Sequence, residues 1–192
     1  MSKKIVVVYH SGYGHTAKVA DAVVEGVKKG GAHVDQLSID ENGQLSDAAW
    51  ALLDAADAII MGTPTYMGGP SWQFKRFADA SSVRWLKGMW RDKVAAGFTN
   101  SGSLSGDKLA TLQQLSVLAM QHSMIWVGLG ESIPQPKGTE MPTISDINRI
   151  GSFTGLMTQS NNESAEIVPP QGDLETARLF GERVATLCKR FS

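Results

Sequence analysis

Short β-branched runs alternate with amphipathic helical patterns along most of this chain, and this alternation restricts the fold more than any other feature of the sequence. Apolar runs typical of buried strands occupy residues 4–10, 33–39, 58–62, 94–99 and 124–129. Helical spacing of apolar residues covers 16–29, the segment after Ser46, 71–80, 108–122 and about 173–191. Strands that alternate with helices predict an α/β fold, with a five-stranded parallel sheet, helices on both faces and right-handed crossovers.

The regular pattern stops between residues 130 and 171. This stretch holds five of the seven prolines, together with many Gly, Ser, Thr and Asn residues. Long segments without secondary structure are uncommon inside compact domains, and they are usually functional or disordered. We therefore expect one domain, residues 1–192, with a long irregular insertion at 130–171 before the last helix.

The composition limits the classes of partner. A formal net charge of −1 provides no overall positive field, so neither nucleic acid nor acidic lipid is expected to bind. Cys188 is the only cysteine, and no H-x-x-H or H-E-x-x-H spacing occurs, so we expect neither a disulfide nor a metal site. No apolar run reaches the ~20 residues of a spanning helix, and the first residues lack the pattern of a signal peptide. These features predict a cytoplasmic protein.

The loop at 11–16 joins a buried strand directly to a helix. In parallel α/β sheets, ligands bind beyond the carboxyl ends of the strands, where the winding direction reverses. The hydroxyl side chains of this loop, its two glycines and the positive end of the following helix suit a phosphate group without a lysine. The candidate phosphate contacts are Ser11, Gly12, Tyr13, Gly14, His15 and Thr16.

Other phosphate-binding motifs are distinguished by their spelling. The chain has no G-x-x-x-x-G-K-[ST], which argues against a P-loop nucleotide hydrolase. It also lacks G-x-G-x-x-G, although Asp40 after the second strand run could imitate the ribose-binding acid of a dinucleotide fold. A tight turn without a ligand is the remaining alternative for residues 11–16.

Two further loops leave the third and fourth strand runs. The loop at 63–70 offers backbone donors, Tyr66 and Met67, which suit the face and rim of a flavin ring. The loop at 100–107 leads into a helix, and its amides suit a ring edge that gains negative charge on reduction. As alternatives, the first is a surface turn and the second a flexible linker. The candidate ring contacts are Pro64, Thr65, Tyr66, Met67 and Gly68, with Asn100, Ser101, Gly102, Ser103, Leu104 and Ser105.

Together, these loops resemble the WrbA-type family of flavodoxin-like NAD(P)H:quinone oxidoreductases. The matching segments are YHSGYGHT at 9–16, AIIMGTPTYMG at 58–68, TNSGSLSG at 99–106 and MQHSM at 120–124. They extend from the N-terminus to about residue 130, and the last helix also fits. The opening S-x-Y-G-H and the G-T-P-T are specific in combination.

The resemblance implies a flavodoxin-like fold with FMN as the cofactor, bound through the three loops. It further implies that Tyr13 lies beside the nicotinamide site and that Trp85 lines the substrate pocket. A family histidine that contacts the flavin aligns with Gln121, next to His122, and either residue can inherit that role. For His122 and for His15, capping or packing roles at a helix end are the alternatives.

Several positions depart from the family pattern. The family usually has an arginine where Tyr66 stands, and a glycine-richer stretch where Leu104 and Ser105 stand. The segment from 130 to 171 is also longer and different. These departures bear on quinone specificity more than on FMN binding.

The expected function is FMN-dependent NAD(P)H:quinone oxidoreduction by a ping-pong mechanism. NAD(P)H would pass a hydride to N5 of the flavin and leave, and a quinone would then take both electrons. Aromatic side chains and backbone amides would position the reactants, without a catalytic acid. The alternatives are a flavodoxin-type one-electron carrier and a non-catalytic FMN-binding regulatory protein. A net charge of −1 argues against the carrier, because carriers rely on a strongly acidic docking face.

The segment 83–90 is unusually rich in aromatic residues for a connection between a helix and a strand. Exposed aromatic side chains at this density often mark an interface. The resemblance implies that a tryptophan at the position of Trp85 reaches a neighbouring subunit's flavin. We therefore expect a homo-oligomer, either a dimer or a tetramer, and the alternative is that Trp85 packs within its own core.

Overall fold

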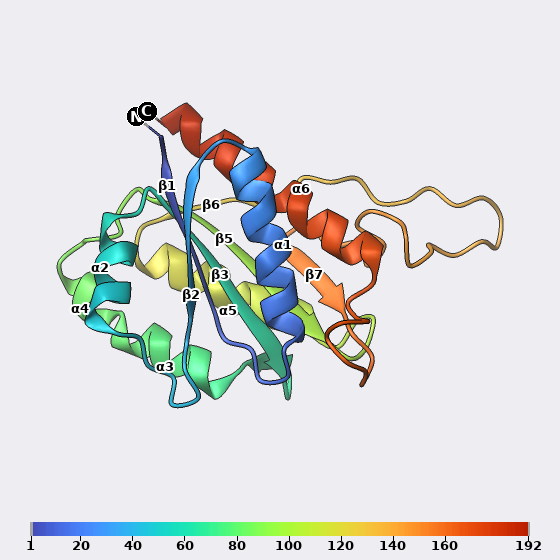
Figure 1. Ribbon diagram of the computed structural model, residues 1–192, viewed down its shortest axis with the longest axis horizontal. Coiled ribbons are helices and arrows are strands. Elements are labelled where there is room, and N and C mark those ends of the chain that lie inside the picture. Colours follow the sequence, from blue (N-terminus) through green and yellow to red (C-terminus); the bar gives the residue numbers. More distant parts are fainter. Residues whose placement is uncertain (1, 192) are drawn as a thin grey trace.

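Three long parallel strands form the centre of the sheet (Figure 1). Strand β1 (Lys4–Tyr9) pairs with β2 (His33–Ser38) on one side and with β3 (Ala58–Tyr66) on the other. Strand β5 (Val94–Ser101) continues the sheet beside β3. The computed structural model describes residues 2–191, so the two end residues of the predicted domain lie outside it.

The edge of the sheet beyond β5 is shared by two short strands. Strand β6 (Ile125–Trp126) pairs with the first residues of β5, and β7 (Leu156–Gln159) pairs with its last residues. The predicted strand at 124–129 is therefore shorter than expected, and the stretch 130–171 contributes a strand that its composition does not signal. The chain leaves the sheet at Gly128, where an added Cβ would lie 2.6 Å from the carbonyl oxygen of Phe153.

Strand β3 is longer than the sequence predicts. The prediction ended this strand at Gly62, because Thr63-Pro64 follows. Strand β1 ends opposite Gly62, so Thr63 and Pro64 have a parallel neighbour, β5, on one side only. A strand that needs hydrogen bonds on one side tolerates Pro64, which has no N–H. After Tyr66 the chain turns back, and β4 (Gly69–Pro70) pairs with the end of β3 in the antiparallel sense.

Helices cover both faces of the sheet, as predicted (Figure 1). Helices α1 (His15–Lys29) and α6 (Gln171–Cys188) lie on one face, and the short helix η1 (Lys189–Phe191) continues α6. The other face carries α2 (Asp47–Ala55), α3 (Trp72–Ala80), α4 (Ser82–Leu86) and α5 (Lys108–Gln121). Two apolar cores result, because successive side chains of a strand point to opposite faces.

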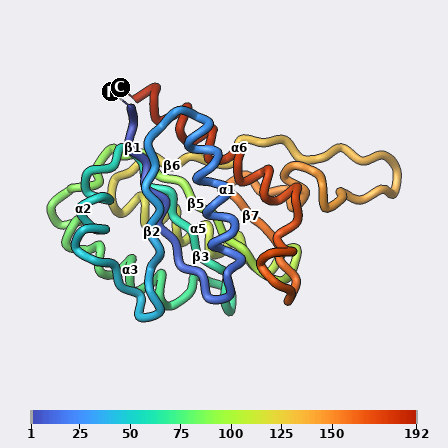
Figure 2. Tube along the Cα trace, viewed as in Figure 1, coloured from blue at the N-terminus to red at the C-terminus, as the bar shows by residue number. Residues whose placement is uncertain are grey.

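The segment between Gly128 and β7 makes an excursion from the sheet. Its outer part extends away from the body of the molecule (Figure 2). At its base, Asn148 ties the excursion to α6, because its N–H donates to Thr176 Oγ1 at 2.9 Å. Within the excursion, its Nδ2 donates to the Ser152 carbonyl at 3.1 Å. Within residues 2–191, no helix is long and apolar enough to cross a membrane.

Helices α1 and α6 approach each other through glycine. A Cβ added at Gly26 of α1 would overlap the carbonyl group of Arg178, and one at Gly181 of α6 would overlap the carbonyl of Val23. Neither glycine has a positive φ, so space rather than backbone conformation requires glycine at these positions. The close contact fixes the two helices that cover the face of the sheet beside the 11–16 loop.

The packing of α1 on α6 yields a stability prediction. Gly181→Ala should reduce the free energy of unfolding by about 2 kcal/mol or more, because an extra methyl group forces the helices apart. The melting temperature should then fall by roughly 4–8 °C. Gly69→Ala is the control, because its Cβ would meet only the end of the Gln114 side chain at 3.3 Å. Equal melting temperatures for the two variants would contradict this account.

Candidate functional site

The three predicted loops meet at one end of the sheet, because β1, β3 and β5 are parallel and end at the same edge. They enclose a pocket of about 210 Å³, named here the carboxyl-edge pocket. Nine of the predicted contacts line it, and three residues from the end of β7 complete it. The lining residues are Tyr13, His15, Thr16, Pro64, Thr65, Tyr66, Asn100, Ser101, Gly102, Ser160, Asn161 and Asn162.

The first loop presents the start of α1 to this pocket. Gly14 takes a left-handed conformation with φ 88°, and Ser11 Oγ accepts a hydrogen bond from the amide of Ala17 at 3.1 Å. The amides of His15 and Thr16 stand in the first turn, where a helix offers no internal acceptor. Thr16 is buried. Amides without an internal acceptor and the positive helix end are features that suit a phosphate group.

The second loop provides an aromatic wall. The Tyr66 ring meets Tyr13 edge to face, with ring centroids 6.1 Å apart. Its hydroxyl oxygen lies 2.6 Å from the point where a Cβ of Gly12 would stand, so a larger residue at this position would displace the Tyr66 side chain. Partial burial, reinforced by Tyr13, raises the pKa of Tyr66. The structure directs Met67 away from the pocket, and its side chain is fully exposed.

Hydroxyl groups behind the wall hold the ends of β3 and β5 together. Thr65 Oγ1 lies 2.8 Å from Thr99 Oγ1 and 2.7 Å from Thr111 Oγ1 of α5. All three threonines are buried. The hydrogen bonds fix Thr65 at the floor of the pocket.

The third loop is fixed at Asn100 and at Lys108. The buried Asn100 side chain accepts hydrogen bonds at Oδ1 from Thr158 Oγ1 at 2.8 Å and from Ser160 Oγ at 3.0 Å. Lys108 Nζ donates to Ser101 Oγ at 2.8 Å and to the Ser103 carbonyl at 2.6 Å. Burial lowers the pKa of Lys108 to about 8.

Some predicted contacts of these loops lie outside the carboxyl-edge pocket. Leu104 and Ser105 line a neighbouring groove beside Arg149 and Met157. The residues absent from the pocket lining also include Ser11, Gly12, Gly14, Met67, Gly68 and Ser103. Ser11, Gly12 and Gly14 belong to the first loop but do not line the pocket.

A fourth loop, after β7, escaped sequence reasoning. Its Ser160, Asn161 and Asn162 line the pocket, and the carbonyl of Glu163 accepts a hydrogen bond from His15 Nε2 at 2.8 Å. The signal available in the sequence is the polar tract SNNES at 160–164, which is separated by two residues from the apolar pair at 156–157. The other three pocket loops are likewise polar segments that follow a strand.

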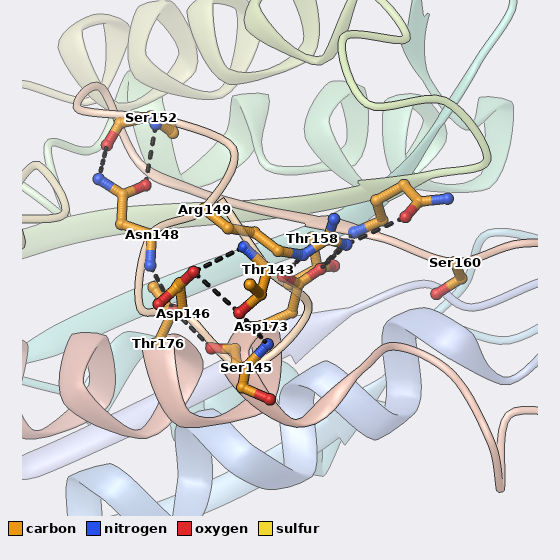
Figure 3. Close-up of polar contacts among 12 residues, drawn as sticks. Thr143, Ser145, Asp146, Asn148, Arg149, Ser152, Thr158, Ser160, Asp173 and Thr176 are labelled. Carbon is orange, nitrogen blue, oxygen red and sulfur yellow. Dashed lines mark hydrogen bonds and ion pairs between the residues drawn. The ribbon is translucent and has the colours of Figure 1, made fainter. Parts of the chain in front are cut away.

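An ion pair below the third and fourth loops holds them together (Figure 3). Arg149 Nε lies 2.6 Å from Asp173 Oδ1, and both side chains are at least nine-tenths buried. Gln159 connects this pair to the pocket, because its N–H donates to Asp173 Oδ2 at 2.8 Å and its Nε2 donates to the Gly102 carbonyl at 2.8 Å. Burial raises the pKa of Asp173, and the guanidinium of Arg149 opposes this effect.

Trp85, Gln121 and His122 lie at the other end of the sheet. Helix α5 starts beside the third loop and runs back to the first residues of β5, where Ile125 is paired with Val94. The three residues line a separate groove of about 440 Å³ between α3, α4 and α5, named here the helix groove. Within one subunit they are therefore not brought to the carboxyl-edge pocket.

The environments of these residues differ. His122 is buried, with its ring centroid 4.4 Å from that of Trp90 and its Nε2 2.8 Å from Ser81 Oγ. Burial lowers its pKa, and its Nδ1 has no hydrogen-bond partner within residues 2–191. Trp85 is 51% exposed, so it does not pack within its own core. The core tryptophan of this segment is Trp90.

Among residues 2–191, no group of three or more His, Cys, Asp or Glu side chains is placed to hold a metal ion. Cys188 is buried in the core on α6, and burial raises its pKa, as expected of an inert thiol.

The chain is similar to a described protein family, to named relatives and to a solved structure. The family described as NADPH-dependent FMN reductase matches residues 4–134. The chain is 47% identical to flavodoxin FldP of Pseudomonas aeruginosa, over 96% of both chains. It is 30% identical to an NAD(P)H dehydrogenase (quinone) of Archaeoglobus fulgidus, over 97% of this chain and 98% of that protein. Among solved structures, a flavodoxin, WrbA-like protein from Agrobacterium tumefaciens matches the whole of both chains, with 50% identity and a TM-score of 0.79.

The buried ion pair yields a prediction about stability and pH. Arg149→Met should reduce the free energy of unfolding by about 3–5 kcal/mol at pH 7, because it leaves the Asp173 carboxylate buried without a partner. The loss should shrink as the pH falls towards 5. Without Arg149, the folded state holds a proton on Asp173 more tightly than the unfolded state, so acid stabilises the variant relative to the wild type.

Lys75→Met is the control, because it breaks an exposed ion pair with Asp79 that contributes about 0–1 kcal/mol. Urea unfolding at pH 7 and pH 5 measures both variants. If Arg149→Met is no less stable than Lys75→Met, the ion pair does not hold the loops.

Proposed function

The chain belongs to the NADPH-dependent FMN reductase family, and from this premise we propose that it is an FMN-dependent NAD(P)H:quinone oxidoreductase. The observation that carries the proposal is the convergence of three loops on one pocket at the start of α1. The name of the Archaeoglobus fulgidus relative supports the same reaction. We also propose a cytoplasmic location, because a free thiol such as that of Cys188 is typical of a reducing compartment.

The residues present fit FMN. The amides of His15 and Thr16, with the Thr16 hydroxyl, would hold the phosphate. Tyr66, Asn100 and Ser101 would contact the ring. A pocket of about 210 Å³ is smaller than the ~300–1,000 Å³ of most ligand sites, so one subunit would cover the ring incompletely. When bound, FMN supplies the acceptor and donor of the two electrons that the reaction transfers.

The protein's own groups would orient the reactants and exclude water. The edge-to-face pair of Tyr13 and Tyr66 forms an apolar rim at the mouth of the pocket. Tyr13 is 79% exposed, which leaves its ring available to a nicotinamide. The hydrogen bonds of Asn100 and of Thr65 hold the floor rigid, so the ring contacts would need little rearrangement on binding.

A one-electron carrier is the second candidate function. The observation that favours it is the 47% identity to a protein named flavodoxin. A carrier would exchange electrons with protein partners and would need a separate reductase to accept electrons from NAD(P)H. A reductase would oxidise NAD(P)H by itself when a quinone is present.

The test combines cofactor binding with turnover. FMN should bind with quenching of its fluorescence, and the complex should oxidise NADH or NADPH rapidly when benzoquinone is added. Thr16→Glu should weaken FMN binding by tenfold or more, because a carboxylate at the phosphate position adds like-charge repulsion.

Thr16→Ser, which keeps the hydroxyl, is the matched control and should bind FMN like the wild type. A protein that binds FMN but oxidises NAD(P)H only with an added reductase would be a carrier. Unchanged FMN affinity in a folded Thr16→Glu variant would place the phosphate elsewhere.

We further propose that the active form is a homo-oligomer. Trp85, Gln121 and His122 lie together in the helix groove, far from the carboxyl-edge pocket of their own subunit. The roles that the resemblance implies for them are thus compatible with this fold only if the groove of one subunit faces the pocket of another. The exposed Trp85 ring and the incomplete cover of the pocket support this arrangement.

The oligomer yields its own prediction. Light scattering should show more than one chain per particle, and Trp85→Ala should reduce benzoquinone turnover at least tenfold while FMN affinity changes less than threefold. Trp72→Ala is the control, because Trp72 is also exposed, at 59%, but does not line the groove. A monomer with full quinone reductase activity would contradict the proposal.

A further inference from the structure

Lys108 is the first residue of α5, and its side chain is completely buried. Its ammonium donates one hydrogen bond to Ser101 Oγ and one to the Ser103 carbonyl, at 2.8 and 2.6 Å. No ion pair within residues 2–191 includes Lys108. A buried cation with two neutral acceptors is costly, since burial penalises the charged form.

The charged groups around Lys108 leave its charge uncompensated. Asp173 and Arg149 act on it in opposite directions, the carboxylate favouring the ammonium and the guanidinium opposing it. These two groups are paired with each other at 2.6 Å. Asp107, the preceding residue, is exposed. The first turn of α5 adds its own positive end. The cluster of Lys108, Arg149 and Asp173 therefore carries one excess positive charge below the third loop.

Ser101 connects this charge to the carboxyl-edge pocket. It lines the pocket, and its Oγ accepts the hydrogen bond from Lys108. The ammonium thus lies one hydrogen bond behind the pocket wall, at a fully buried position. An electrostatic interaction at this depth is weakened by the solvent far less than one at the surface.

We propose that Lys108 is a positioning residue of the FMN site, which holds the 101–106 loop in place and, through its charge, favours the reduced cofactor over the oxidised one. The inference rests on the proposed function. Two-electron reduction adds negative charge to the ring edge that this loop would contact. A fixed positive charge behind the loop stabilises the reduced form more than the oxidised form, because it interacts with charge that only the reduced form carries.

The experiment compares the affinity of each variant for oxidised and for reduced FMN at pH 7, without oxygen. In Lys108→Met, the ratio of the oxidised to the reduced dissociation constant should fall threefold or more. This fall corresponds to a midpoint potential lower by about 14 mV or more, at 29.6 mV per tenfold change. Loss of loop positioning alone would weaken both affinities equally and leave the ratio unchanged.

Lys93→Met is the matched control. Lys93 is partly buried, its pKa is also lowered by burial, and its Nζ donates to the carbonyls of Leu53, Asp54 and Ala56. It stands at the opposite end of β5 from Ser101. Lys93→Met should lose stability without changing the ratio of the oxidised to the reduced dissociation constant.

A second measurement uses pH and does not require a neutral variant. Arg does not lose its proton in the accessible range, whereas the pKa of Lys108 is about 8. For each protein, the measured quantity is again the ratio of the oxidised to the reduced dissociation constant of FMN. This ratio in the wild type, divided by the same ratio in Lys108→Arg, should be constant from pH 6 to 7 and should fall threefold or more by pH 9.5. The comparison with Lys108→Arg removes the ionisation of the flavin itself.

The possible failures are distinguishable. If the wild type does not bind FMN, the proposed function is wrong and this inference falls with it. If the wild type binds FMN but Lys108→Met changes the ratio by less than threefold, or Lys93→Met changes it equally, the charge of Lys108 has no role. The inference is also overturned if the wild-type ratio of dissociation constants, divided by that of Lys108→Arg, does not change between pH 7 and 9.5.

Discussion

The parallel pairing of β1, β3 and β5 is the constraint on which the site depends. Parallel strands end at one edge of the sheet, so loops distant in the sequence must leave it side by side. Strand β1 ends opposite Gly62, whereas β3 and β5 stay paired to Pro64 and Asn100. This offset leaves space beside the longer strands for the start of α1, and it creates the carboxyl-edge pocket. The apolar cores on both faces hold the sheet in which this offset occurs.

The excursion after Gly128 divides the last edge of the sheet between two short strands. Two residues of β6 and four of β7 do not form a stable edge on their own, since short strands make few hydrogen bonds. The ion pair of Arg149 with Asp173 compensates, because it joins the excursion to the first turn of α6 and, through Gln159, to the third loop. The same contacts that close the sheet therefore fix the pocket wall.

The sequence was sufficient for the parts that depend on local patterns. The strands β1, β2 and β5 follow from periodicity, and the helix starts at Ser46 and Ser71 follow from periodicity and side-chain capping. It was insufficient where contacts join distant segments. The short strand β7 has too few residues for a clear period, and its neighbours in the pocket lie more than 50 positions away. Helix α5 explains why Trp85 and His122 lie apart from the pocket, because its 14 residues span about 21 Å.

Lys93, which is partly buried just before β5, and Lys108, which is fully buried beyond its other end, show how differently the fold treats the same side chain. Lys93 places its ammonium among the last carbonyls of α2, where the helix end is negative and three acceptors surround the charge. Lys108 places its ammonium at the start of α5, where the helix end is positive and two acceptors are available. The arrangement of Lys93 is a C-terminal cap of helix α2. The arrangement of Lys108 opposes the helix dipole, so the fold gains less from it than from a neutral side chain. Residues that break a local rule in this way are expected at functional sites, and the hydrogen bond from Lys108 to Ser101 leads directly to the pocket.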